Sequence, residues 1–197
     1  MMHADFYDRA YFDGTGKSNY CSYTGTSSPF EAHADAVVAM LREYSLDGPV
    51  LDIGCAKGFL VAELRRRGVD AHGADWSPYA IAEAPAEVRP YLHRAGAHDL
   101  PFADGQFALA VSFDVLEHMD LGYAQRALPE IARVSRWQLH QANTGRLDIW
   151  RFDGDASHCT RLPLEQWQAL AVALDLPHTV VCEPDRRLPF LSEVHAT

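Results

Sequence analysis

Short apolar runs alternate with amphipathic stretches along most of the chain. The apolar runs predict strands over residues 49–53, 69–74, 91–94, 107–113, 137–141 and 179–182. Apolar residues at helical spacing predict helices over residues 29–47, 58–67, 77–84, 128–134 and 164–174. Pro129 is expected in the first turn of its helix, where a proline is tolerated. Strands that alternate with helices predict an α/β fold, in which helices cover both faces of a parallel sheet.

The first part of the chain has no steady period and is rich in tyrosine, serine, glycine and aspartate. We therefore divide the chain into residues 1–47, an N-terminal lid with its helix, and residues 48–197, the main domain. Five aromatic residues gather in the N-terminal segment: Tyr7, Tyr11, Phe12, Tyr20 and Tyr23. They are interpreted either as a cover over a ligand or as residues that simply pack on the sheet.

The acidic composition narrows the range of partners. The 197 residues carry a formal net charge of -10, and 48% of them are hydrophobic, which suits a globular core. The basic clusters at residues 65–67 and 186–187 are interpreted as solvated surface, so nucleic acid is not expected. The chain shows no membrane span and no apolar core of a signal peptide. The four cysteines have neither metal-site nor disulfide spacing, so a reduced, cytoplasmic protein is expected.

The motif that carries the chemistry lies at residues 50–59, which read VLDIGCAKGF, followed by GADW at residues 73–76. Glycine at the end of a strand lets the backbone turn tightly at the carboxyl edge of the sheet, where open α/β sheets bind ligands. Asp75 ends the next strand, at a place where a carboxylate can accept hydrogen bonds from both hydroxyls of a ribose. Taken alone, Asp75 is more often a helix cap or a solvated acid.

Two classes of cofactor use this layout. The dinucleotide fingerprint G-x-G-x-x-G requires glycine where this chain has Ala56 and Phe59, so a nicotinamide cofactor fits poorly. S-adenosylmethionine carries no phosphate and needs only room for methionine and adenosine.

The motif blocks resemble those of class I methyltransferases, and of their bacterial small-molecule branch in particular. Residues 50–58 resemble motif I, with Ala56 in place of its middle glycine, and Asp75 matches the acid of motif II. The segments HDLPF at 98–102 and DVLEH at 114–118 resemble two later motifs in the expected order. The resemblance implies a doubly wound, mostly parallel sheet of seven strands, the last of which is expected at residues 188–194.

The resemblance also implies S-adenosylmethionine as the cofactor, with Asp99 at the adenine amino group and Leu100 on the ring. The candidate cofactor-binding residues are Asp52, Gly54, Cys55, Ala56, Gly58, Asp75, Trp76, Asp99, Leu100 and Phe113, together with Tyr20 from the N-terminal segment. Residues 141–155 are interpreted either as a loop over the substrate or as poorly ordered.

Methyl transfer from a sulfonium needs a base only when the acceptor must lose a proton. His118 and His158 are the candidate catalytic residues, since a histidine titrates near neutral pH. A structural role beside the cofactor fits His118 equally well, and a loop-ordering hydrogen bond fits His158. The histidines match no standard ligand spacing, so no metal is expected.

The leading hypothesis is an enzyme that methylates a small molecule, such as a sugar or a secondary metabolite, at oxygen or nitrogen. One alternative is a fold that binds the cofactor without transferring methyl, as a cyclase or a binding module. An RNA or protein methyltransferase and a nicotinamide oxidoreductase are less consistent with the charge and the motifs. The oligomeric state is left open between monomer and homodimer.

Overall fold

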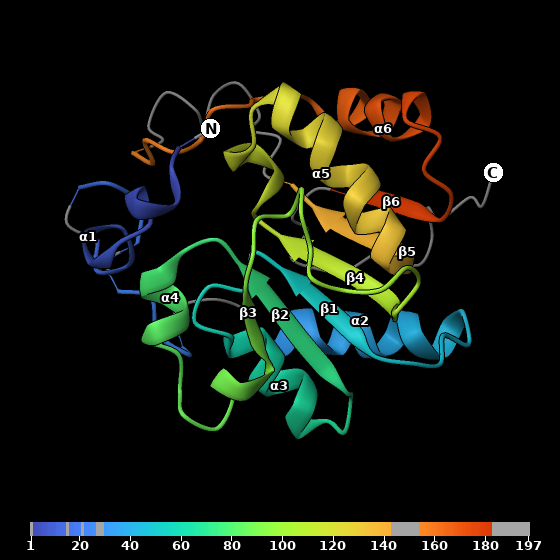
Figure 1. Ribbon diagram of the computed structural model, residues 1–197, viewed down its shortest axis with the longest axis horizontal. Coiled ribbons are helices and arrows are strands. Elements are labelled where there is room, and N and C mark those ends of the chain that lie inside the picture. Colours follow the sequence, from blue (N-terminus) through green and yellow to red (C-terminus); the bar gives the residue numbers. More distant parts are fainter. Residues whose placement is uncertain (1, 15, 21, 27–29, 143–153, 183–197) are drawn as a thin grey trace.

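The computed structural model of this chain describes residues 2–14, 16–20, 22–26, 30–142 and 154–182. Six strands form one sheet in the order β3-β2-β1-β4-β5-β6, and each neighbouring pair is parallel (Figure 1). The strands are β1 (Val50–Ile53), β2 (Ala71–Asp75), β3 (Leu92–Arg94), β4 (Phe107–Phe113), β5 (Ser135–Gln141) and β6 (Thr179–Cys182). The predicted parallel α/β sheet is confirmed, and the seventh strand expected at residues 188–194 lies outside the described residues.

Helices cover both faces of the sheet, as the alternating pattern predicted. Helices α2 (Phe30–Glu43) and α3 (Phe59–Arg66) lie on one face, and α5 (Leu121–Val134) and α6 (Leu164–Ala173) lie on the other (Figure 1). The shorter elements are α1 (Arg9–Phe12), α4 (Pro78–Ala82) and the 3-10 turns η1 (Ala4–Phe6), η2 (Arg89–Tyr91) and η3 (Leu116–His118).

Two apolar clusters follow from the alternation of side chains along the strands. In β1, Leu51 and Ile53 join the cluster under α5, while Val50 joins the cluster under α2 and α3. Side chains point to opposite faces at successive strand positions, and here both faces are covered. The central strands are therefore apolar almost throughout, and six of the seven residues of β4, from Phe107 to Ser112, are buried.

The prediction for Pro129 is wrong. Helix α5 begins at Leu121, and the carboxylate of Asp120 accepts a hydrogen bond from the backbone N–H of Tyr123 (2.8 Å). This N-cap sets the start of the helix well before Pro129, which lies in the interior. The apolar pattern understated the helix because its first two residues, Leu121 and Gly122, are exposed.

The order of strands reverses between β1 and β4, so the chain leaves these neighbours toward opposite faces. Open α/β sheets bind their ligands at such a switch point, outside the carboxyl ends of the strands. The N-terminal segment and α4 lie beside this edge of the sheet (Figure 1). Within the described part of the chain, no helix is both long and apolar enough to span a lipid bilayer.

Candidate functional site

A tight turn follows β1 at the carboxyl edge. Gly54, Ala56 and Gly58 all have positive φ angles of 72°, 48° and 74°. A Cβ atom at Gly54 would lie 2.6 Å from Cγ2 of Val115, so this position has no room for a side chain. Ala56 has a left-handed conformation, and its backbone N–H donates a hydrogen bond to the carboxylate of Asp75 (2.7 Å). The turn thus brings the backbone of the first loop against the end of β2.

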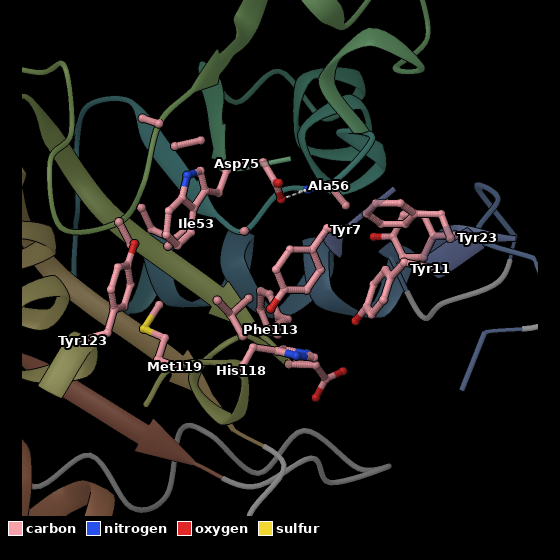
Figure 2. A pocket seen from close by; sticks show the side chains of 18 of the residues that line it. Tyr7, Tyr11, Tyr23, Ile53, Ala56, Asp75, Phe113, His118, Met119 and Tyr123 are labelled. Atoms are coloured by element: carbon pink, nitrogen blue, oxygen red, sulfur yellow. Dashed lines mark hydrogen bonds between the residues drawn. The ribbon is translucent and has the colours of Figure 1, made fainter. Parts of the chain in front are cut away.

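Asp75 is the polar centre of this edge. Its Oδ2 accepts from the N–H of Ala56 at 2.7 Å (Figure 2). Its Oδ1 accepts from the N–H of Ser77, also at 2.7 Å. Each carboxylate oxygen can accept a second hydrogen bond, so two further donors can be held by a group whose orientation is already set. Burial raises the pKa of Asp75, and the two backbone hydrogen bonds oppose that rise.

A cavity of about 830 Å³, counted out to its open mouth, lies against this turn. Its walls come from β1, β2 and β4, from the loop after β4, and from the N-terminal segment. Trp76 and Tyr123 stand on one wall as a stacked pair, with ring centroids 5.6 Å apart. Among the described residues that line the cavity, two are aspartates, Asp75 and Asp114, and none is a lysine or arginine.

Aromatic side chains of the N-terminal segment form the opposite wall. Tyr7, Tyr11 and Tyr20 line the cavity together with Phe12 and Tyr23. Burial raises the pKa of the Tyr7, Tyr11, Tyr20 and Tyr23 hydroxyls, so these phenols stay protonated at neutral pH. The segment is tied to the main domain where Ser77 Oγ donates to the carbonyl of Tyr7 (2.5 Å).

His118 lines the cavity at the end of η3, and a chain of hydrogen bonds fixes its ring. Its Nδ1 lies 2.8 Å from Oγ of Ser157, which donates to Oδ1 of Asp155 (2.5 Å). Tyr11 donates to the other oxygen of Asp155 (3.1 Å). Because the Ser157 proton goes to Asp155, we assign the Nδ1 proton to His118, so its Nε2 is the unprotonated nitrogen. Figure 2 shows Asp75 and His118 on opposite sides of the Tyr7 ring in this view.

His158 lies beside His118, although 40 residues separate them in sequence. Their ring centroids are 4.6 Å apart, and Nε2 of His158 lies 3.9 Å from Oδ2 of Asp155. The two candidate catalytic residues are therefore close together. Glu117, which the sequence analysis did not single out, is fully buried and offers a carboxylate oxygen within 4.8 Å of a nitrogen of each histidine.

The structure places some of the candidate cofactor residues at the cavity and others away from it. Gly54, Ala56, Asp75, Trp76, Phe113 and Tyr20 line the cavity. Asp52 and Cys55 line an adjoining pocket of about 410 Å³ behind the turn, and Gly58 caps α3 at its N-terminus. Burial and the charge of Asp75 raise the pKa of Asp52.

Asp99 and Leu100 do not line the cavity. Asp99 is exposed and borders a separate open depression next to Trp76, whereas Leu100 is buried in the core. The backbone N–H of Leu100 donates to Oε1 of Glu130 in α5 (2.8 Å). Ala95 and Ala97 occupy the wall of the cavity instead.

Several lining residues were missed from the sequence. Tyr123 and Met119 enter from the start of α5 and the loop before it, where no motif marks them. Ser157 and Asp155 do not line the cavity, but hydrogen bonds connect them to two residues that do, His118 and Tyr11.

Comparison with known proteins finds similarity to methyltransferases. Residues 50–138 match the family model described as "Methyltransferase domain". An "Uncharacterized methyltransferase" from Mycobacterium sp. (strain KMS) is 38% identical over 88 residues, which cover 44% of this chain and 34% of the relative. The chain thus spans about a third of the length of the curated relatives that it matches.

Two solved structures share the fold. A SAM-dependent methyltransferase from Archaeoglobus fulgidus aligns with a TM-score of 0.58 at 18% identity, over 72% of this chain and 68% of that chain. A putative methyltransferase from an antibiotic biosynthesis pathway of Anabaena variabilis gives a TM-score of 0.58 at 18% identity, over 75% and 62%. Residues 50–138 therefore match a methyltransferase domain in sequence, and the described sheet and helices share the fold of these methyltransferase structures.

Proposed function

We propose that this protein is an S-adenosylmethionine-dependent methyltransferase that acts on a small molecule, such as a sugar or a secondary metabolite, at oxygen or nitrogen. The observation that carries the proposal is the lining of the cavity beside the glycine turn. It presents two carboxylates and a ring of aromatic faces, with no lysine or arginine among its described residues. A sulfonium cation is attracted by such a wall, whereas a pyrophosphate would be repelled.

The residues present fit the cofactor. Asp75 has capacity for two hydrogen bonds from ribose hydroxyls, and Trp76 with Tyr123 offers flat apolar surface to an adenine ring. Asp52 and Cys55, in the adjoining pocket, stay candidates for the methionine end, and Gly54 keeps the backbone turn open to it. When bound, S-adenosylmethionine supplies a methyl group that is already activated on sulfur.

The protein mainly has to hold the acceptor next to that methyl group. We propose that His118 and His158 mark the acceptor end, with Asp155 and Ser157 fixing the His118 ring. An unprotonated Nε2 on His118 can take the proton of a hydroxyl acceptor. The N-terminal segment serves as the lid, since it closes the cavity with tyrosines that remain neutral.

The proposed acceptor is small because the cavity is walled by this lid. The net charge of -10 disfavours nucleic acid. We also propose that the enzyme works in the cytoplasm, where the three described cysteines stay reduced. A cofactor-binding fold with a non-methylating role is the alternative that product analysis separates.

The test is calorimetric titration with S-adenosylmethionine of the wild type, Asp75→Asn and Asp70→Asn. Asp75→Asn leaves its backbone donors with a weaker acceptor and turns one oxygen into a donor, so affinity should fall at least tenfold. Asp70 precedes the same strand at its opposite end and is exposed, so Asp70→Asn should bind like the wild type. Equal affinities for all three proteins would refute the role of Asp75. Transfer of labelled methyl to a panel of sugars, phenols and amines then separates the methyltransferase from the binding module.

A further inference from the structure

Three potential metal ligands converge beside the cavity. Glu117, His118 and His158 each offer one ligand atom, and these atoms all lie within 4.8 Å of one another. A tetrahedral ion with bonds of about 2.1 Å holds its ligand atoms about 3.4 Å apart. Side-chain rotations that move these atoms by about an ångström would therefore bring all three within bonding distance of one ion. His118 is itself a lining residue of the cavity, so the set borders the space proposed for the acceptor.

The backbone holds these residues together from two distant segments. Glu117 and His118 belong to the turn η3 after β4, and His158 comes from the loop before α6. The carbonyl of Glu117 accepts from the N–H groups of Cys159 (2.9 Å) and Thr160 (3.0 Å), which pins that loop to η3. The convergence of the three side chains is therefore built into the fold.

The partners of His118 match those of a metal-bound histidine. Ligating histidines commonly donate their other ring N–H to an oxygen that is itself hydrogen-bonded, which sets the tautomer and the ring orientation. Here Nδ1 of His118 lies 2.8 Å from Oγ of Ser157, and Ser157 is held by Asp155. The assigned tautomer leaves Nε2 to coordinate.

The charge around the set also favours a cation. Glu117 is fully buried, and Asp155 is 6% exposed with Oδ2 3.9 Å from His158. The negative charge of these two carboxylates beside the two histidines favours the binding of a cation there.

We propose that Glu117, His118 and His158 bind one divalent transition-metal ion, such as Zn²⁺ or Mn²⁺, at the acceptor end of the cavity. Two imidazoles and one carboxylate suit these ions better than Mg²⁺, which prefers oxygen ligands and retains its waters. Three protein ligands leave a coordination position for a water or a substrate, as in catalytic sites. This inference departs from the expectation of no metal, which considered only short sequence spacing.

The consequence for function rests on the methyltransferase activity proposed above. With the ion bound, Nε2 of His118 is a ligand and no longer the base proposed above. A hydroxyl oxygen that occupies the open position then loses its proton to water, because the ion stabilises the resulting alkoxide. That alkoxide is the nucleophile for O-methylation: its oxygen would form the bond to the methyl carbon as the carbon–sulfur bond of S-adenosylmethionine breaks and S-adenosylhomocysteine leaves. The site therefore favours hydroxyl acceptors, and vicinal diols that can chelate the ion, over amines.

The experiment uses the full chain after treatment with EDTA and dialysis. Calorimetric titration with Zn²⁺ should give one ion per chain, and Co²⁺ should give a visible spectrum of a nitrogen and oxygen site. His158→Asn and Glu117→Gln should each weaken Zn²⁺ binding by about 100-fold or more. His178→Asn is the matched control, since His178 is exposed, precedes β6 at the opposite edge of the sheet, and has a φ of 56° that asparagine tolerates.

Cys159→Ser tests a competing donor, because the thiol is exposed one residue beyond His158. Retained Zn²⁺ affinity in this variant supports the proposal, and lost affinity with intact His158 overturns it. The proposal is also overturned if the wild type binds no stoichiometric ion, or if His158→Asn, shown folded by circular dichroism, binds it equally well. Titration with S-adenosylmethionine is scored separately: Asp75→Asn should lose cofactor and keep metal, and His158→Asn should lose metal and keep cofactor.

Discussion

Asp155 connects the N-terminal segment, through Tyr11, with the loop before α6, through Ser157, which in turn contacts His118. Its replacement therefore tests the chain of hydrogen bonds that fixes the His118 ring. It accepts from the hydroxyl of Tyr11 (3.1 Å), and from the N–H (2.8 Å) and the hydroxyl (2.5 Å) of Ser157. Asp155→Ala leaves these three donors without their acceptor in a site where Ser157 is fully buried. An unsatisfied buried donor costs about 1–3 kcal/mol.

Ala156, the next residue, is exposed, so solvent can reach the site and form hydrogen bonds with some of the three donors. We therefore expect Asp155→Ala to lower the free energy of unfolding by about 3 kcal/mol, which is less than the summed cost of three unsatisfied donors. For a chain of this size, that loss lowers Tm by about 6–12 °C. Asp155→Asn keeps one carbonyl oxygen for Ser157, so it should lose only about 1 kcal/mol.

The assay combines urea denaturation, cofactor titration and methyl transfer on each variant. Both variants should bind S-adenosylmethionine within about twofold of the wild type, because Asp155 lies outside the cofactor end of the cavity. Methyl transfer should fall in the order wild type, Asp155→Asn, Asp155→Ala, as His118 loses its orientation. Unchanged stability and unchanged transfer in Asp155→Ala would refute the hydrogen-bond chain.

Two further predictions concern the core and the turn. Burial lowers the pKa of His140 to about 4, whereas a histidine in the unfolded chain has a pKa of about 6.5. As the pH falls from 6.5 to 4, the unfolded chain therefore binds a proton that the folded chain does not, and the folded state loses stability. His140→Asn should remove about 3 kcal/mol of that pH dependence in urea titrations, and an unchanged slope would contradict the burial argument. In Gly54→Ala, the alanine is strained by the left-handed backbone and its Cβ would lie 2.6 Å from Val115. This variant should lose about 3 kcal/mol of stability and most of its affinity for the cofactor. Gly68→Ala, at a φ of 81° with open space around it, isolates the strain and should lose only about 1 kcal/mol, so equal losses would show that the contact is unimportant.

The local elements of the fold could be predicted because their signals are local. The apolar run of β4 and the cap of α4 by Ser77, which accepts from the N–H of Ala80, both follow from adjacent residues. The start of α5 could not be predicted from apolar spacing, because a single N-cap residue, Asp120, sets it while the first turn faces solvent. The short helix α1 has the same origin: Asp8 caps it by accepting from the N–H of Tyr11.

The candidate site was predictable where one motif supplies it. Gly54, Ala56 and Asp75 meet because the parallel neighbours β1 and β2 end at the same edge of the sheet and the chain turns tightly after β1. The convergence of His118 with His158 depends on the path of the loop before α6 and on its backbone bonds to Glu117. Neither the path of this loop nor its backbone hydrogen bonds can be predicted from a sequence motif. The positions of Asp99 and Leu100 depend on how their segment packs against α5, through the bond from Leu100 to Glu130.

The most direct test of the central claim is a parallel calorimetric titration of the wild-type protein with S-adenosylmethionine and with NADH. The acidic, aromatic lining of the cavity predicts one S-adenosylmethionine bound per chain and no measurable heat from NADH. Binding of NADH without binding of S-adenosylmethionine would contradict the account.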